Sequence, residues 1–90
     1  MLRITPVESP NDSVMLRLEG RVSGPWVDEL RAACEKALNL KKILALNLAE
    51  VSFLDVAGVN LLANLRARGV ELVECSIFVR EQLRTNNLRY

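Results

Sequence analysis

The sequence predicts an α/β fold in which helices pack against a small mixed β-sheet, built as a single domain over residues 1–90. Two β-type runs, 2–7 and 13–20, flank a turn-rich segment at 8–12, which indicates a β-hairpin. Beyond the hairpin, segments with helical periodicity alternate with apolar β-type runs. Such alternation predicts right-handed crossovers onto a parallel sheet, to which the hairpin adds an antiparallel pair.

The first helix is expected within residues 21–39, and its start is well marked. Ser23 or Gly24 can cap it, and Pro25 suits the first helical position, where its missing N–H is not needed. Apolar residues then recur every three or four positions, which predicts one buried stripe. The stripe consists of Val27, Leu30, Cys34, Ala37 and Leu38.

Residues 41–48 are nearly continuous in apolar side chains, which predicts a parallel strand buried on both faces and continuing to Asp55. A second helix is expected over residues 57–68, with Gly69 as its C-cap. The apolar stripe of this helix consists of Gly58, Leu61, Leu62 and Leu65.

The remaining chain predicts a strand at 70–75 and a last helix at 77–84, for which Ser76 is a candidate cap. The expected order is therefore β-β-α-β-α-β-α. Cys34 and Cys75 both lie within apolar patterns, and we interpret them as core cysteines.

Composition argues against several classes of partner. The net charge is +1 with acids and bases interspersed, so no basic patch for nucleic acid is indicated. No apolar run approaches the roughly 20 residues of a membrane helix, so no direct membrane insertion is expected. Because the N-terminus also lacks the features of a signal peptide, we expect a cytoplasmic protein.

The sequence offers little for catalysis. It contains no histidine, no nucleophile-elbow motif and no phosphate-binding loop, so we expect no enzyme and no cofactor. Two cysteines without histidine make a zinc site unfavourable, and no metal is expected. Glu50 and Asp55 could form an acidic pair, although solvated loop acids are the commoner interpretation.

The stretch ILALNLAEVSFLDVAGVNLLANL, residues 43–65, carries a family resemblance. An apolar strand ends in Asn47-Leu48, a short turn contains Val51 and Phe53, and Asp55-x-x-Gly58 opens a leucine-rich helix. In this order the features resemble the STAS family, the domain of sulfate transporters and anti-sigma factor antagonists. The resemblance extends over most of the chain and implies the STAS fold.

In bacterial antagonists of this family, an anti-sigma kinase phosphorylates the hydroxyl residue that follows the aspartate. The unphosphorylated form binds that kinase and frees the sigma factor. Here Val56 holds that position and Ala57 follows, so the resemblance implies protein binding without phosphorylation. Family members usually continue past the third helix with another strand and helix, so we expect a shortened C-terminal end.

Asp55 is expected to cap the second helix, with Val56 at an exposed tip beside it. Gly58 in the first turn indicates either close packing against the sheet or close approach of a partner, and Trp26 is either a core anchor or part of an apolar contact patch. The partner-binding residues we predict are Asp55, Val56, Ala57, Gly58, Val59, Asn60, Ser23 and Trp26.

The resemblance leaves the partner open. The first candidate is an anti-sigma factor or a related switch kinase. The second is the ATPase of an ABC-type lipid transport complex, which a stand-alone STAS subunit can serve. A third alternative is a passive scaffold subunit of a stress-signalling assembly, and a homodimer also stays open.

Overall fold

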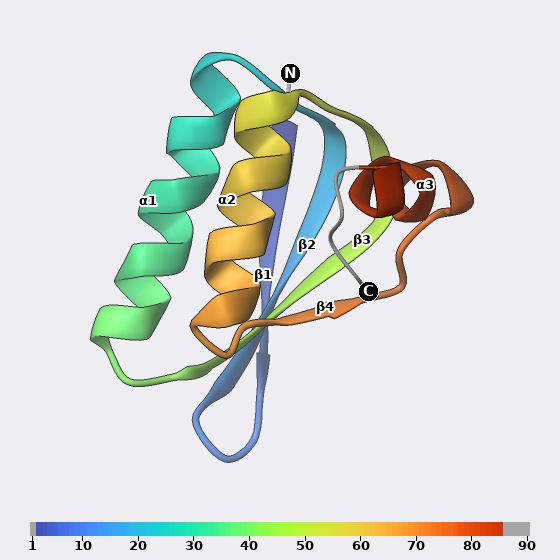
Figure 1. The fold of residues 1–90 in the computed structure, drawn as a ribbon. Coiled ribbons are helices and arrows are strands. Elements are labelled where there is room, and N and C mark those ends of the chain that lie inside the picture. The colour runs from blue at the N-terminus through green and yellow to red at the C-terminus, as the bar shows by residue number, and fades with distance from the viewer. Residues whose placement is uncertain (1, 86–90) are drawn as a thin grey trace.

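The chain begins with an antiparallel hairpin of β1 (Leu2–Ser9) and β2 (Ser13–Val22) (Figure 1). The computed structural model describes residues 2–85. The turn places Asn11 and Asp12 at φ values of 68° and 56°. Asn and Asp adopt this left-handed region more readily than other side chains, which explains why the turn falls here.

Five further elements follow the hairpin in the predicted order, β-β-α-β-α-β-α overall. They are α1 (Pro25–Asn39), β3 (Ile43–Leu54), α2 (Val56–Ala67), β4 (Glu71–Val73) and α3 (Ile77–Thr85).

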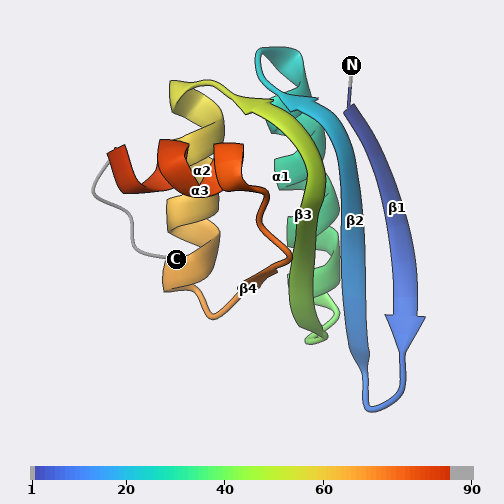
Figure 2. The same ribbon diagram turned by 90° about the vertical axis from the view of Figure 1, so that its right-hand side faces the viewer.

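The strands form one mixed sheet in the order β1-β2-β3-β4. β2 and β3 are parallel and so are β3 and β4, whereas β1 is antiparallel to β2. Figure 2 shows α1 and α2 packed against one face of the sheet, with α3 beside β3. This arrangement confirms the predicted mixed sheet with helices packed against it.

The core fills the space between the sheet and the helices. Alternate residues of β3, namely Leu44, Leu46 and Leu48, point into it and are buried. Ala45 and Asn47 point the other way and are only half-buried, because α1 and α2 both cover the same face. The prediction that this strand is buried on both faces is therefore wrong.

β4 is shorter than the predicted strand at 70–75. Glu74 adopts a φ of 57°, which turns the chain away after three residues. β4 consequently pairs only with Ala45–Asn47, and the second half of β3 has no strand beside it on that edge within residues 2–85.

The start of α1 is confirmed, whereas the start of α2 differs from prediction by one residue. α1 begins at Pro25, and α2 begins at Val56 rather than at residue 57. α2 ends at Ala67, and Gly69 follows at a φ of 92°, as expected for a glycine just beyond a helix end. Within residues 2–85 no helix has the length and apolarity needed to cross a bilayer.

Candidate functional site

Two strand-to-helix junctions meet at one end of the sheet. β2 and β3 are parallel and pair up to their last residues, Val22 and Leu54. Because parallel strands point the same way, α1 and α2 both start from this end. Asp55 lies between β3 and α2, where it can reach the start of either helix.

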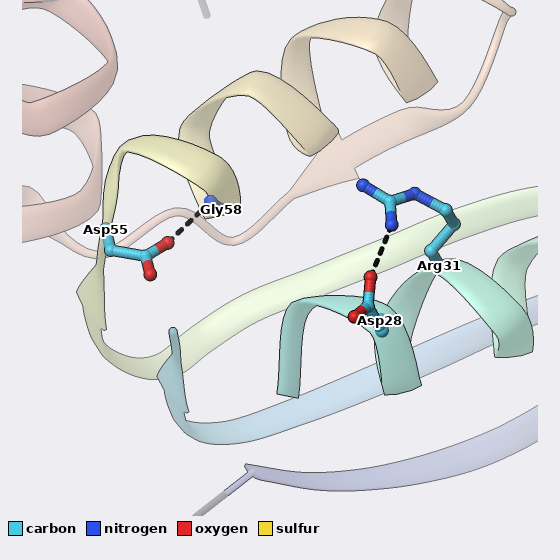
Figure 3. A network of polar contacts seen from close by, with 4 residues as sticks. All are labelled: Asp28, Arg31, Asp55 and Gly58. Carbon is cyan, nitrogen blue, oxygen red and sulfur yellow. Dashed lines mark hydrogen bonds and ion pairs between the residues drawn. The ribbon is translucent and has the colours of Figure 1, made fainter. Parts of the chain in front are cut away.

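The Asp55 carboxylate accepts hydrogen bonds from both helix starts. Its Oδ1 accepts from the backbone N–H of Gly58 at 2.7 Å, which caps α2 as predicted (Figure 3). Its Oδ2 accepts from the backbone N–H of Gly24 at 2.9 Å, at the start of α1. A negative charge between two helix N-termini is favoured because both carry a partial positive charge.

The start of α1 has no side-chain cap, and its first-turn N–H groups at Trp26 and Val27 donate instead to the carbonyl oxygens of Ser23 and Gly24. Its N-cap is Gly24, which has no side chain to bond the first-turn N–H groups. Gly24 also adopts a φ of 56° and a ψ of −134°, a conformation that disfavours any residue with a side chain. Of the two predicted caps, the structure uses Gly24, and Ser23 lies just before it.

Gly58 brings the start of α2 against the end of β2. A Cβ atom on Gly58 would lie 2.6 Å from the carbonyl oxygen of Val22, too close for any real contact. The N–H of Asp55 also donates to this carbonyl oxygen, at 3.2 Å. Of the two alternatives for Gly58, close packing against the sheet is confirmed, and Gly58 is buried.

The other predicted contact residues differ in exposure. Val56 is 71% exposed, and Ala57 and Asn60 are also exposed. Ser23 and Trp26 are half-buried, and Trp26 packs against the core.

The expectation that Val59 belongs to an exposed patch is wrong, because its side chain is only 5% exposed. The physical reason is helical spacing: Val59 lies three residues before the buried Leu62 and therefore shares its face.

Two of the charged side chains near the helix starts make contacts within the domain. Asp28, in the first turn of α1, forms an ion pair with Arg31 one turn later (Figure 3). Arg21 places its guanidinium 5.1 Å from the ring centre of Phe53, across the paired ends of β2 and β3. On α2 itself, the exposed Val56 is followed by two exposed, uncharged residues, Ala57 and Asn60.

The arrangement offers little for covalent chemistry. Both oxygens of Asp55 accept backbone N–H groups, and Glu50 is an exposed residue of β3. Within residues 2–85 no three Cys, Asp or Glu side chains gather as a metal site. Burial raises the pKa of the Cys34 thiol to about 12, so this thiol stays protonated and unreactive at neutral pH.

Three contacts are not evident from the sequence. One is the bond from Gly24 to Asp55. The second is the pair of hydrogen bonds between the side-chain amide of Gln82, on α3, and the backbone of Leu54. The third is a two-fold ion pair between Glu35 and Arg68, which ties the middle of α1 to the end of α2. All three join segments 28 to 33 residues apart, and local sequence patterns carry no signal for them.

Comparison with known proteins agrees with this geometry. The STAS domain family model matches residues 4–84, so the chain belongs to the STAS family. No curated protein matches the chain at a significant level.

Among solved structures, the chain is similar to the anti-sigma factor antagonist SpoIIAA in its unphosphorylated form. The TM-score is 0.74 at 23% sequence identity, and the match covers 96% of this chain and 82% of that one. At this identity the likeness shows a shared fold.

Proposed function

We propose that this STAS domain is a non-catalytic, cytoplasmic regulatory module that binds another protein. Its contact surface consists of Val56, Ala57 and Asn60, flanked by Ser23 and Trp26. The observation that carries the proposal is the 71% exposure of Val56 at a helix start that Asp55 fixes from two directions.

A single exposed valine is unremarkable on a protein surface. Here, however, the backbone beneath it is held by the two bonds of Asp55 and by the close packing of Gly58 on Val22. A surface that is already ordered loses little conformational entropy on binding, so more of the contact energy appears as affinity. The contact surface is therefore suited to a partner with a shallow apolar depression.

The first candidate partner is an anti-sigma factor or a related switch kinase. The STAS family membership and the fold shared with an anti-sigma factor antagonist support this class. Because Val56 carries no hydroxyl group, a kinase cannot phosphorylate this position. Binding would then be constitutive, set by the amounts of the two proteins.

The absent hydroxyl favours a second candidate, a partner that is not a protein kinase. The ATPase of an ABC-type lipid transport complex is such a partner, and a STAS subunit would bind it stably without any switch. A scaffold made of copies of this chain is the third alternative, and sedimentation would reveal it as self-association at micromolar concentration.

The proposal can be tested by titrating the ¹⁵N-labelled domain with a purified anti-sigma kinase or transporter ATPase of the same organism. We expect amide resonances to shift at Val56, Ala57 and Asn60 and at the start of α1. A groove of about 420 Å³ between β1 and α1 is the natural control region, lined among others by Pro6 and Ala33. Shifts confined to that groove would move the binding site there and overturn the proposal.

A further inference from the structure

Among residues 2–85, the second half of β3 has a strand neighbour on one side only. Val22 of β2 pairs with Leu54 on that side. On the other edge β4 has already ended, since it reaches only Ala45–Asn47. Figure 2 shows α3 lying beside β3 beyond the end of β4.

Gln82 on α3 takes the place of the missing strand neighbour. Its Oε1 accepts from the backbone N–H of Leu54 at 3.0 Å, and its Nε2 donates to the carbonyl oxygen of Leu54 at 2.8 Å. One residue's N–H and C=O are thus bonded by one side chain, as a residue in an antiparallel ladder would bond them. Val79 and Leu83, both fully buried, anchor α3 on either side of Gln82.

Leu54 is followed directly by Asp55, so the carbonyl oxygen that Gln82 bonds and the N–H of Asp55 belong to the same peptide unit. We propose that Gln82 is a positioning residue for the contact surface, acting through Leu54 and Asp55 on Gly58, Gly24 and Val56. α3 is then coupled to partner binding: a change that lifts α3 from β3 loosens both helix starts and weakens the surface. This inference rests on the proposed function.

The alternative is that Gln82 only seats α3 and leaves the helix starts unaffected. The two are separated by amide hydrogen exchange, which reports local opening of individual N–H groups. The informative amide is that of Gly58, which donates to Asp55 and not to Gln82. The amide of Leu46, in the part of β3 that pairs with both β2 and β4, serves as the internal reference for opening of the whole domain.

The test compares the wild-type domain with Gln82→Met, which keeps a similar length but removes both hydrogen bonds. Arg84→Gln is the matched control, because it breaks the ion pair with Glu81 on the same helix. We expect exchange at Leu54 and Gly58 to rise about tenfold relative to Leu46 in Gln82→Met, as loss of a hydrogen-bonded tie implies. In Arg84→Gln these ratios should stay at the wild-type value.

A faster Leu54 amide with an unchanged Gly58 amide would overturn the proposal. Equal acceleration of amide exchange at Leu46 and Gly58 would also overturn it, because Gln82 would then stabilise the whole domain and not the helix starts in particular. If Gln82→Met does not fold, Gln82→Glu gives the same comparison, since an ionised carboxylate keeps the acceptor for Leu54 N–H and loses the donor. The measurement needs no partner, so its failure is distinguishable from failure of the binding titration.

Discussion

The backbone N–H groups at the starts of α1 and α2 find their hydrogen-bond acceptors in different ways. Each helix begins with backbone N–H groups that have no partner within the helix. α2 follows Asp55, whose side chain bonds the N–H of Gly58 three residues on. α1 follows Gly24, which has no capping side chain, and its N–H bonds the same Asp55 from 31 residues away. One start is encoded locally, and the other depends on the completed fold.

This difference teaches that Asp55 has more than a capping role. Its carboxylate joins the start of α1 to the start of α2, while Gly58 packs against Val22 at the end of β2. A change at Asp55 should therefore disturb two helices, whereas a change at an ordinary cap disturbs one.

The largest effect is expected for Asp55→Ala. Loss of the α2 cap together with the bond to Gly24 should lower the free energy of unfolding by about 1–3 kcal/mol. Urea denaturation followed by circular dichroism measures this value. The matched control is Ser76→Ala, because Ser76 Oγ caps α3 through a single bond from the N–H of Val79.

The control should cost about 0.5–2 kcal/mol, the usual range for one cap. If Asp55→Ala costs no more than Ser76→Ala, the bond to Gly24 contributes nothing. The two helix starts would then be independent.

The next effect is expected for Gly58→Ala. Alanine normally favours a helix over glycine, but here the new Cβ would meet the Val22 carbonyl oxygen at 2.6 Å. Since that atom belongs to the backbone of β2, the helix start must move, and we expect a net loss of about 1–2 kcal/mol in unfolding free energy.

Asn60→Ala is the control for Gly58→Ala, because residue 60 is exposed on the same helix. It should leave the denaturation midpoint unchanged or slightly raised. A Gly58→Ala protein as stable as wild type would contradict close packing of α2 on β2.

A smaller, pH-dependent effect is expected away from the helix starts, at Glu35 and Arg68. The hydrogen bonds from Arg68 lower the pKa of the Glu35 carboxyl below its ordinary value of 4.5. The ion pair therefore stabilises the fold above that value, and this stabilisation is lost as the pH falls through the lowered pKa. Glu35→Gln should flatten this part of the curve of unfolding free energy against pH.

Glu29→Gln is the control for the pH curve, since within residues 2–85 Glu29 of the same helix has no ion pair. Its curve should follow that of wild type between about pH 5 and pH 3. Identical curves for Glu35→Gln and wild type would mean that the contact between α1 and α2 carries no pH-dependent stability.

Local rules were enough for most of the fold and for part of the site. Residue-by-residue preferences predict the hairpin, the helix starts at Pro25 and after Asp55, and the glycine that follows α2, Gly69. The Asp55 cap and the exposure of Val56 were likewise predictable, because both depend on the position within the first helical turn.

What could not be predicted depends on contacts between distant segments. The long-range bonds to Asp55 and Leu54 need the assembled sheet. The half-buried face of β3, with Ala45 and Asn47, was not predicted, because an apolar run does not reveal whether helices cover one face of a strand or both. Val59 was misplaced because its burial depends on how α2 is rotated against the sheet.

The central claim is that Asp55 presents Val56 on a rigid surface for a protein partner. Val56→Glu tests it most directly, with Leu40→Glu as the control, because Leu40 is also exposed, at 62%, and lies beyond the other end of α1. Partner affinity and melting temperature are measured side by side for wild type and both variants.

We expect Val56→Glu to keep the wild-type melting temperature, because a negative charge in the first turn of a helix is favoured. Its affinity for the partner should fall at least tenfold, since an unpaired charge would be buried in an apolar contact, while Leu40→Glu should bind as wild type does. Equal affinities for Val56→Glu and wild type would contradict the claim. A joint loss of affinity and stability would show instead that Val56 supports the fold.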